Sequence, residues 1–204
     1  MFLQKFLQII LWLPAKILLP TKVVGKKNLV KGGAIYACNH QSSLDIPTLS
    51  LNLVRKQHYL AKMEYFKKGK KSFLYRCDAI PINRENPDLS SIKKCLQLLK
   101  EDKIITIFPE GTRKNKYPLE NFKAGIAIFA IKSQKPVIPM WIVKKPKILR
   151  FNTLKIGEPL YFNEFIGKKL SDDVIKNAES KIYYGLKQLS IDVKKLNKKN
   201  LNLV

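Results

Sequence analysis

Acidic residues are scarce in this sequence. Its 204 residues include 15 Asp and Glu against 39 Lys and Arg, a formal net charge of +24. Such a chain should be attracted to polyanions, namely nucleic acid, an anionic membrane surface or phosphorylated substrates. A general lysine bias would explain part of the charge without any ligand. No acidic residue precedes Asp45, whereas six lysines do, so the imbalance is greatest near the N-terminus.

Cysteine and glycine-rich motifs are also scarce. The three cysteines, Cys38, Cys77 and Cys95, lie far apart and in no C-x-x-C spacing. This pattern argues against a disulfide framework or a zinc site and favours a reducing compartment. The sequence has no G-x-G-x-x-G or Walker pattern, so Gly32–Gly33 predicts a turn rather than a phosphate loop. Repeats and low-complexity linkers are absent from the sequence, and 46% of its residues are hydrophobic, which predicts one globular domain.

Hydrophobic residues dominate the N-terminal segment, but Pro14 interrupts the run. Fourteen of the first twenty residues are hydrophobic. A helix of residues 1–13 would be about 20 Å long, which is too short to span a hydrocarbon core of ~30 Å. A cleaved signal peptide is not favoured either, because no small-x-small cleavage site follows these residues. We therefore expect residues 1–22 to form an amphipathic helix in the membrane interface, with its lysines near lipid phosphates. The alternative is a helix packed on the domain's own core.

Predicted strands and helices alternate along residues 23–204. We expect strands at 34–38, 58–62, 78–82, 104–108 and 137–143, and helices at 45–56, 88–102, 122–133 and from 171 to about 196. This order predicts an α/β fold, a single-domain mixed sheet covered by helices. Ligands of such sheets bind beyond the strand ends. Two polar motifs fall there: CNHQSSLD after the first of these strands and FPEGTR after the fourth.

His40 and Asp45 form an H-x4-D pair within the first motif. If Asp45 opens the following helix, its carboxylate can fold back to the imidazole, fix one tautomer and leave the other ring nitrogen free as a base. The spacing alone is a weak signal, because a capping Asp and an unrelated loop His would look the same.

The two motifs together are more specific. NHQSSLD (39–45) and FPEGTR (108–113), about seventy residues apart, resemble the glycerolipid acyltransferase family, in particular the bacterial 1-acyl-glycerol-3-phosphate (lysophosphatidate) acyltransferases. AKMEYF (61–66), DAIPINR (78–84) and VIPMWI (137–142) resemble further blocks of that family. The chain departs from the family pattern at Asp78, where glycine is usual, and at Ile126, where alanine is usual.

The resemblance implies transfer of a fatty acyl group from a thioester to an alcohol. His40 would be the general base and Asp45 its orienting acid, without a serine or cysteine nucleophile, a metal or a cofactor; acyl-CoA or acyl carrier protein would be the co-substrate. The implied acceptor is a phosphate monoester, for which Arg113 is the first expected ligand. The full set of expected substrate-binding residues is Arg84, Glu110, Gly111, Thr112, Arg113 and Lys123. Glu110 would bind the acceptor's glycerol hydroxyl or anchor its loop, and Gly111 would allow close approach of the backbone.

The expected partners are lysophosphatidate, the acyl thioester, acyl carrier protein and an anionic membrane surface. The expected location is the cytoplasmic face of the bacterial inner membrane, with monotopic or peripheral attachment. Nucleic acid is not expected, because the aromatic residues fall mainly in apolar runs. Two alternatives remain: an acyltransferase for another lysolipid or for glycerol 3-phosphate, and a non-catalytic basic protein that binds membrane or nucleic acid.

Overall fold

The computed structural model describes residues 14–66, 79–83, 89–111 and 125–201, with side chains up to residue 191. Expectations for residues 1–13, 67–78, 84–88, 112–124 and 202–204 lie outside this part of the chain. The elements are β1 (Thr21–Val24), η1 (Lys26–Asn28), β2 (Ala34–Cys38), α2 (Asp45–Asn52), β3 (Gln57–Lys62), η2 (Met63–Phe66), β4 (Ile80–Ile82), α4 (Leu89–Lys100), β5 (Ile104–Ile107), α5 (Gly125–Ser133), β6 (Val137–Ile142), β7 (Asn152–Ile156), η3 (Asn163–Phe165) and α6 (Asp172–Leu201).

The strands among these residues form one mixed sheet in the order β1-β7-β6-β2-β5-β3-β4. From β6 to β4 all neighbouring strands are parallel. β7 runs antiparallel to β6, and β1 pairs in parallel with β7. The carboxyl ends of β2, β5 and β6 therefore meet at one edge of the sheet, and the amino ends of β1 and β7 lie at that same edge.

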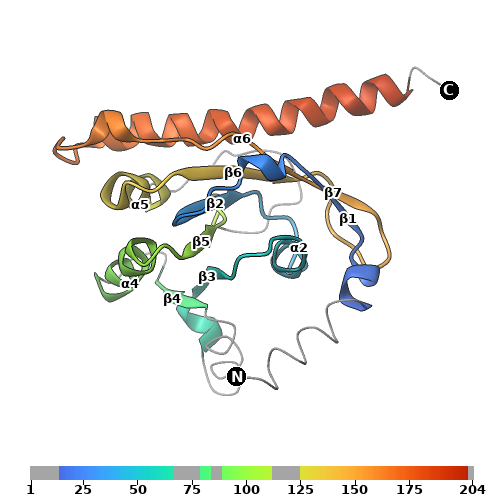
Figure 1. Cartoon of the computed structure of the whole chain (residues 1–204), viewed down its shortest axis with the longest axis horizontal. Helices are drawn as coiled ribbons and strands as arrows, with labels where there is room; N and C mark the ends of the chain where they lie inside the picture. Colours follow the sequence, from blue (N-terminus) through green and yellow to red (C-terminus); the bar gives the residue numbers. More distant parts are fainter. Residues whose placement is uncertain (1–13, 67–78, 84–88, 112–124, 202–204) are drawn as a thin grey trace.

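The sheet separates two hydrophobic cores, and strand β2 shows how. Ile35 and Ala37 face a core with α4, α5 and α6, whereas Tyr36 and Cys38 face a second core with Leu49 of α2. Alternate side chains of a strand point to opposite faces, and here both faces are apolar and buried. Figure 1 shows α4, α5 and α6 together on one side of the sheet and α2 on the other. The predicted α/β fold with a mixed, helix-covered sheet is confirmed.

Some predicted element boundaries are wrong. Helix α2 ends at Asn52 rather than residue 56, because Leu53 is already extended (φ −111°, ψ 120°) and buried. Just beyond it, the Arg55 guanidinium donates to the carbonyl oxygens of Val30, Gly32 and Asp102, which holds this connection away from a helical path. Helix α6 continues to Leu201 instead of ending near residue 196.

Strands β1 and β7 were not predicted. β7 alternates buried and half-buried residues, the period expected of a strand, but only five residues carry the pattern. β1 has four residues and no fully buried one, so little in its sequence distinguishes it from a loop. β1 begins at Thr21, just before the predicted boundary between residues 22 and 23, and its pairing with β7 ties this part of the chain to the sheet.

The expected interfacial helix lies mostly outside the described residues. Residues 14–18 form a short helical turn that is followed by the buried side chain of Leu19. Within the part of the chain that the structure covers, no helix is both long and apolar enough to cross a membrane.

Candidate active site

The candidate site lies where β2, β5 and β6 end. The chain leaves β2 into the turn Asn39–Asp45, and it leaves β5 into Phe108–Gly111. Because β5 and β6 flank β2 in parallel, these segments meet at the carboxyl edge of the sheet. Polar ligands of α/β sheets bind at such an edge.

His40 and Asp45 are in direct contact. His40 Nδ1 lies 2.7 Å from Asp45 Oδ2, with the histidine 7% exposed and the aspartate fully buried. The same oxygen accepts hydrogen bonds from the backbone N–H groups of Gln41 (2.6 Å) and Ser42 (2.8 Å). An oxygen already facing two donors is an acceptor toward His40 as well, so Nδ1 carries the proton. Neutral His40 is thereby held with Nε2 unprotonated.

Asp45 also begins α2, so one carboxylate serves both the helix and the histidine. The N-terminus of a helix favours negative charge, because its first N–H groups have no partner within the helix. All the hydrogen bonds of the carboxylate go to Oδ2; Oδ1 is buried and meets no hydrogen-bond partner among the described residues. The prediction that Asp45 opens the helix and folds back to His40 is confirmed in its geometry.

Phe108 fixes the imidazole from one face. Its ring centroid lies 4.1 Å from that of His40, with 19° between the planes. Phe108 also stacks on Tyr59, with 6.4 Å between the ring centroids and 16° between the planes. The Tyr59 hydroxyl donates to Gln57 Oε1 at 2.7 Å and lies 2.9 Å from Ser50 Oγ, and burial raises its pKa. A buried, neutral, hydrogen-bonded phenol therefore supports the aromatic stack that restrains His40.

Asn39 anchors the turn to the neighbouring strand. Its side-chain Oδ1 accepts from the N–H of Ile142 (2.8 Å), and its Nδ2 donates to the carbonyl of Ile142 (3.1 Å). Gln41 Nε2 donates to the same carbonyl at 2.7 Å. The amide of Asn39 acts as one more backbone unit of the β2–β6 ladder, which places the next residue, His40, at the strand end.

The second motif forms a tight turn against the first. The N–H of Gly111 donates to the carbonyl of Phe108 at 3.0 Å, and Gly111 has φ 68°, which glycine adopts at little cost. Glu110 is 8% exposed. Burial raises the pKa of the Cys38 thiol well above its usual range, and the carboxylates of Asp45 and Glu110 both raise it further. Both acidic groups therefore lie near Cys38, and the fold brings the two motifs together.

This geometry agrees with comparisons to known proteins. A family model described as acyltransferase matches residues 20–143, more than half of the chain. The chain belongs to the acyltransferase family. The family prediction made from the two sequence motifs is confirmed.

The chain is also similar to individual members of the acyltransferase family. The 1-acyl-sn-glycerol-3-phosphate acyltransferase of Bacillus subtilis (strain 168) is 39% identical over 157 residues, 71% of this chain and 75% of that protein. A chloroplastic relative with the same enzyme name from Brassica napus is 31% identical over 134 residues, which cover 63% of this chain but only 39% of the longer plant protein. The crystal structure of the acyltransferase PlsC from Thermotoga maritima has a TM-score of 0.61 and 24% identity, covering 83% of this chain and 71% of that one. That structure shows the same fold.

The remaining predicted site residues of this acyltransferase divide into two groups. Glu110 and Gly111 lie in the turn beside the catalytic candidates, as expected from their motif. The other four, Arg84, Thr112, Arg113 and Lys123, lie outside the described residues, so their roles stay predictions. Within the described part of the chain, no group of three His, Cys, Asp or Glu is placed to hold a metal ion.

The sequence did not reveal which residues position His40 and Asp45. Asn39 and Phe108 stand inside the two motifs, so the motif boundaries were the available signal. Tyr59 and Gln57 gave no signal, because their contribution depends on β3 lying beside β5. Cys38 and Cys95 are buried and form no disulfide. His58 is buried in β3.

Proposed function

We propose that this acyltransferase moves a fatty acyl group from acyl-CoA or acyl carrier protein to the free hydroxyl of 1-acyl-sn-glycerol 3-phosphate and makes phosphatidate. The observation that carries the proposal is the buried contact of 2.7 Å between His40 Nδ1 and Asp45 Oδ2 in a chain of this family. The names of the Bacillus and Brassica relatives support the choice of acceptor.

His40 Nε2 takes the proton of the acceptor hydroxyl as its oxygen attacks the thioester carbonyl carbon. A positioned base is needed because an unaided alcohol is a weak nucleophile. The buried carboxylate of Asp45 stabilises the imidazolium that forms. The tetrahedral intermediate then collapses, its C–S bond breaks, and the imidazolium returns the proton to the departing sulfur. The products are the ester and the free thiol, and the enzyme ends the cycle with His40 neutral.

Recognition of the acceptor is assigned to the second motif and to basic residues predicted from the sequence. Glu110, held in the turn beside Phe108, binds the glycerol part of the acceptor or anchors that turn. Arg113, Arg84 and Lys123 bind the phosphate, since a dianion is best matched by guanidinium and ammonium groups. Thr112, between Gly111 and Arg113 in the sequence, completes this set. The reaction as written requires no cofactor or metal.

The enzyme would act at the cytoplasmic face of the bacterial inner membrane as a monotopic or peripheral protein, because its acceptor stays in the bilayer. The net charge of +24 supports attraction to an anionic lipid surface. Residues 1–22 would be the attachment segment.

One assay tests the proposal. Purified protein in detergent receives an acyl-CoA or an acyl carrier protein thioester, together with 1-acyl-glycerol 3-phosphate, another lysolipid or glycerol 3-phosphate, and products are identified by mass spectrometry. Phosphatidate should be the dominant product, and His40→Ala should lower turnover at least ~10²-fold. Preferential acylation of another acceptor would reassign the substrate.

Ser43→Ala is the matched control for this experiment. Ser43 lies in the same turn and is exposed, so the proposed mechanism gives it no chemical role, and turnover should stay within about twofold of the parent. Loss of activity in Ser43→Ala with full activity in His40→Ala would favour a covalent serine mechanism and contradict the assignment. Thermal melting of both variants separates chemistry from folding.

A further inference from the structure

Five large apolar side chains are exposed together near the amino ends of β1 and β7. Two come from the turn before β1, and three come from the connection between β6 and β7. Their exposed fractions are 61% for Ile17, 43% for Leu18, 62% for Ile148, 70% for Leu149 and 62% for Phe151. We call this set the apolar tip. Contiguous exposed apolar surface of this kind marks an interaction site in a soluble domain.

Backbone hydrogen bonds hold the two halves of the apolar tip together. The N–H of Leu149 donates to the carbonyl of Leu18 at 2.7 Å, and the N–H of Asn152 donates to the carbonyl of Pro20 at 2.9 Å. The Asn152 side chain closes the base of the connection by binding both the N–H and the carbonyl of Lys144. Figure 1 shows the blue N-terminal turn beside the orange β6–β7 connection.

Leu149 is held in an unusual conformation. It has φ 58° although it is not glycine, and an L-residue with a Cβ adopts the left-handed region only at a cost in free energy. The conformation places a large apolar side chain at the exposed point of a turn in which the N–H of Arg150 meets the carbonyl of Lys147. Strain that persists at an exposed position suggests that the position has a function.

The surroundings of the apolar tip are basic. No Asp or Glu occurs between Glu120 and Glu158, whereas the β6–β7 connection contains Lys144, Lys145, Lys147 and Arg150, all of them exposed. The sequence before Asp45 is equally free of acid. Exposed apolar side chains with cations nearby in the chain match an anionic bilayer, because the acyl chains take up the apolar side chains and the lipid phosphates attract the cations.

The topology places the apolar tip and the candidate active site beyond the same edge of the sheet. The β6–β7 connection leaves the sheet after Ile142, the residue to which the Asn39 side chain is bonded. His40 leaves the sheet at the same edge, one strand away. A bilayer touching the apolar tip therefore lies on the side of the molecule from which a membrane-held acceptor would approach His40.

We propose that the apolar tip docks this protein on an anionic membrane surface, where Ile148, Leu149 and Phe151 enter the interface beside Ile17 and Leu18. The inference rests on the proposed lipid acceptor, and it adds to the membrane-facing surface three residues of the β6–β7 connection that lie outside residues 1–22.

The test uses the full chain with Ile148→Ser, Leu149→Asn and Phe151→Ser combined. Asn tolerates positive φ, so the turn is kept while apolar area is removed, and residues 1–22 are left intact. Binding is measured by co-sedimentation with vesicles of phosphatidylglycerol and phosphatidylcholine, and with phosphatidylcholine alone. The triple variant should bind the mixed vesicles at least ~10-fold more weakly than the parent protein.

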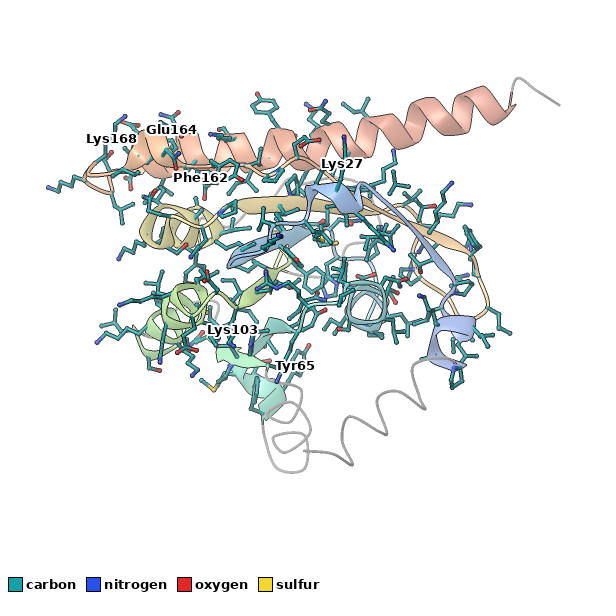
Figure 2. The ribbon with its side chains drawn as sticks, viewed as in Figure 1. Lys27, Tyr65, Lys103, Phe162, Glu164 and Lys168 are labelled. Carbon is teal, nitrogen blue, oxygen red and sulfur yellow. The ribbon has the colours of Figure 1, made fainter. Side chains whose placement is uncertain are left out.

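A double variant, Val54→Ser with Ile166→Ser, is the matched control. Both side chains are exposed (102% and 61%) but lie elsewhere, Val54 between α2 and the amino end of β3. Ile166 lies between Glu164 and Lys168, which Figure 2 shows at the opposite end of the molecule from the N-terminal turn. Vesicle binding of this control should stay within twofold of the parent protein.

Three outcomes would overturn the docking proposal. The triple variant could bind vesicles as well as the parent protein, or the double variant could lose as much vesicle binding as the triple variant. In the third outcome, the parent protein self-associates in lipid-free buffer and the triple variant does not. The last would assign the apolar tip to contact between two copies of the chain. Activity on a short-chain, water-soluble lysophosphatidate is measured in parallel. If the parent protein acylates this short-chain acceptor but the triple variant binds vesicles normally, the docking proposal is wrong and the proposed function stands. If the parent protein cannot acylate the short-chain acceptor but vesicle binding depends on the apolar tip, the proposed function is wrong and the docking proposal stands.

Discussion

Replacing Asp45 by Asn separates the charge of this side chain from its hydrogen bonds. Oδ2 receives the backbone N–H groups of Gln41 and Ser42 as well as His40 Nδ1. An Asn amide group turned toward these donors would clash with them, so the variant must place its oxygen there and its NH2 at the former Oδ1 position. The orientation and tautomer of His40 are then kept, and what is lost is the negative charge beside the imidazolium.

The structure sets the scale of that loss. With 2.7 Å between the two atoms in contact, the charge centres are about 4 Å apart, where unit charges interact by roughly 4 kcal/mol at an effective dielectric constant near 20. This would slow the reaction by about 10³-fold at most, since each 1.36 kcal/mol is a factor of ten. Part of the loss is recovered by the remaining hydrogen bond. We expect kcat to fall by about 10²- to 10³-fold, with little change in the KM for the acceptor.

The assay is steady-state acyl transfer in detergent, with thermal melting of the same preparations. Asp45→Ala is the comparison variant, because it also leaves the two half-buried backbone N–H groups of Gln41 and Ser42 without their acceptor, and an unsatisfied group costs up to about 1–3 kcal/mol when it is buried. Asp45→Asn should therefore melt close to the parent protein and Asp45→Ala well below it. Turnover of Asp45→Asn within threefold of the parent would refute a role for the charge.

The remaining predictions concern the acceptor, one glycine and one surface carboxylate. Arg113→Ala should raise the KM for the acceptor far more than that for the donor, with partial recovery in Arg113→Lys; equal effects in kinetic assays would indicate a structural role. Gly25→Ala should lower the urea-derived free energy of unfolding by more than about 2 kcal/mol, because Gly25 has φ 84° and a Cβ there would lie 2.2 Å from the carbonyl oxygen of Ile156; an unchanged urea midpoint would be inconsistent with that clash. A hydrogen bond from Lys135 lowers the pKa of Asp102, so its stabilisation exists above the usual carboxyl pKa and is lost as the pH falls through the lowered value. Asp102→Asn should therefore melt below the parent at pH 7, and the difference should close below about pH 4; a pH-independent difference would contradict this.

The central part of the fold could be predicted from the sequence because it is apolar on both faces. Strands such as Ala34–Cys38 and Val137–Ile142 are buried at every position, so their apolar runs are continuous. The His40–Asp45 contact followed from the motif, since a carboxylate that opens the helix can reach an imidazole at the preceding strand end. The family followed from two motifs whose residue types are specified at nearly every position.

Features that depend on strand order could not be predicted. The stack of Tyr59, Phe108 and His40 joins residues that follow or belong to three different strands, and it forms only because β5 lies between β2 and β3. The hydrogen bonds of Asn39 to Ile142 span 103 positions in the chain and require β6 on the other side of β2. Local patterns contain no information on such neighbours, so the sequence shows Asn39 and Phe108 as motif residues but not as the residues that position His40.

Asn39 connects the chemistry to the proposed membrane contact. By bonding both polar groups of the Ile142 backbone, it fixes the turn that carries His40 to the last residue of β6, and the connection that carries the apolar tip starts at the next residue. The Asn152 side chain then clamps the base of that connection through Lys144. These hydrogen bonds, with the backbone from Ile142 to Lys144 between them, join the turn of His40 to the surface that would meet the bilayer. Since the acyl chain of a lysolipid stays in the membrane, its hydroxyl is available only near a fixed depth. The proposed base, His40, would then meet that hydroxyl at the edge of the sheet without the acceptor leaving the bilayer.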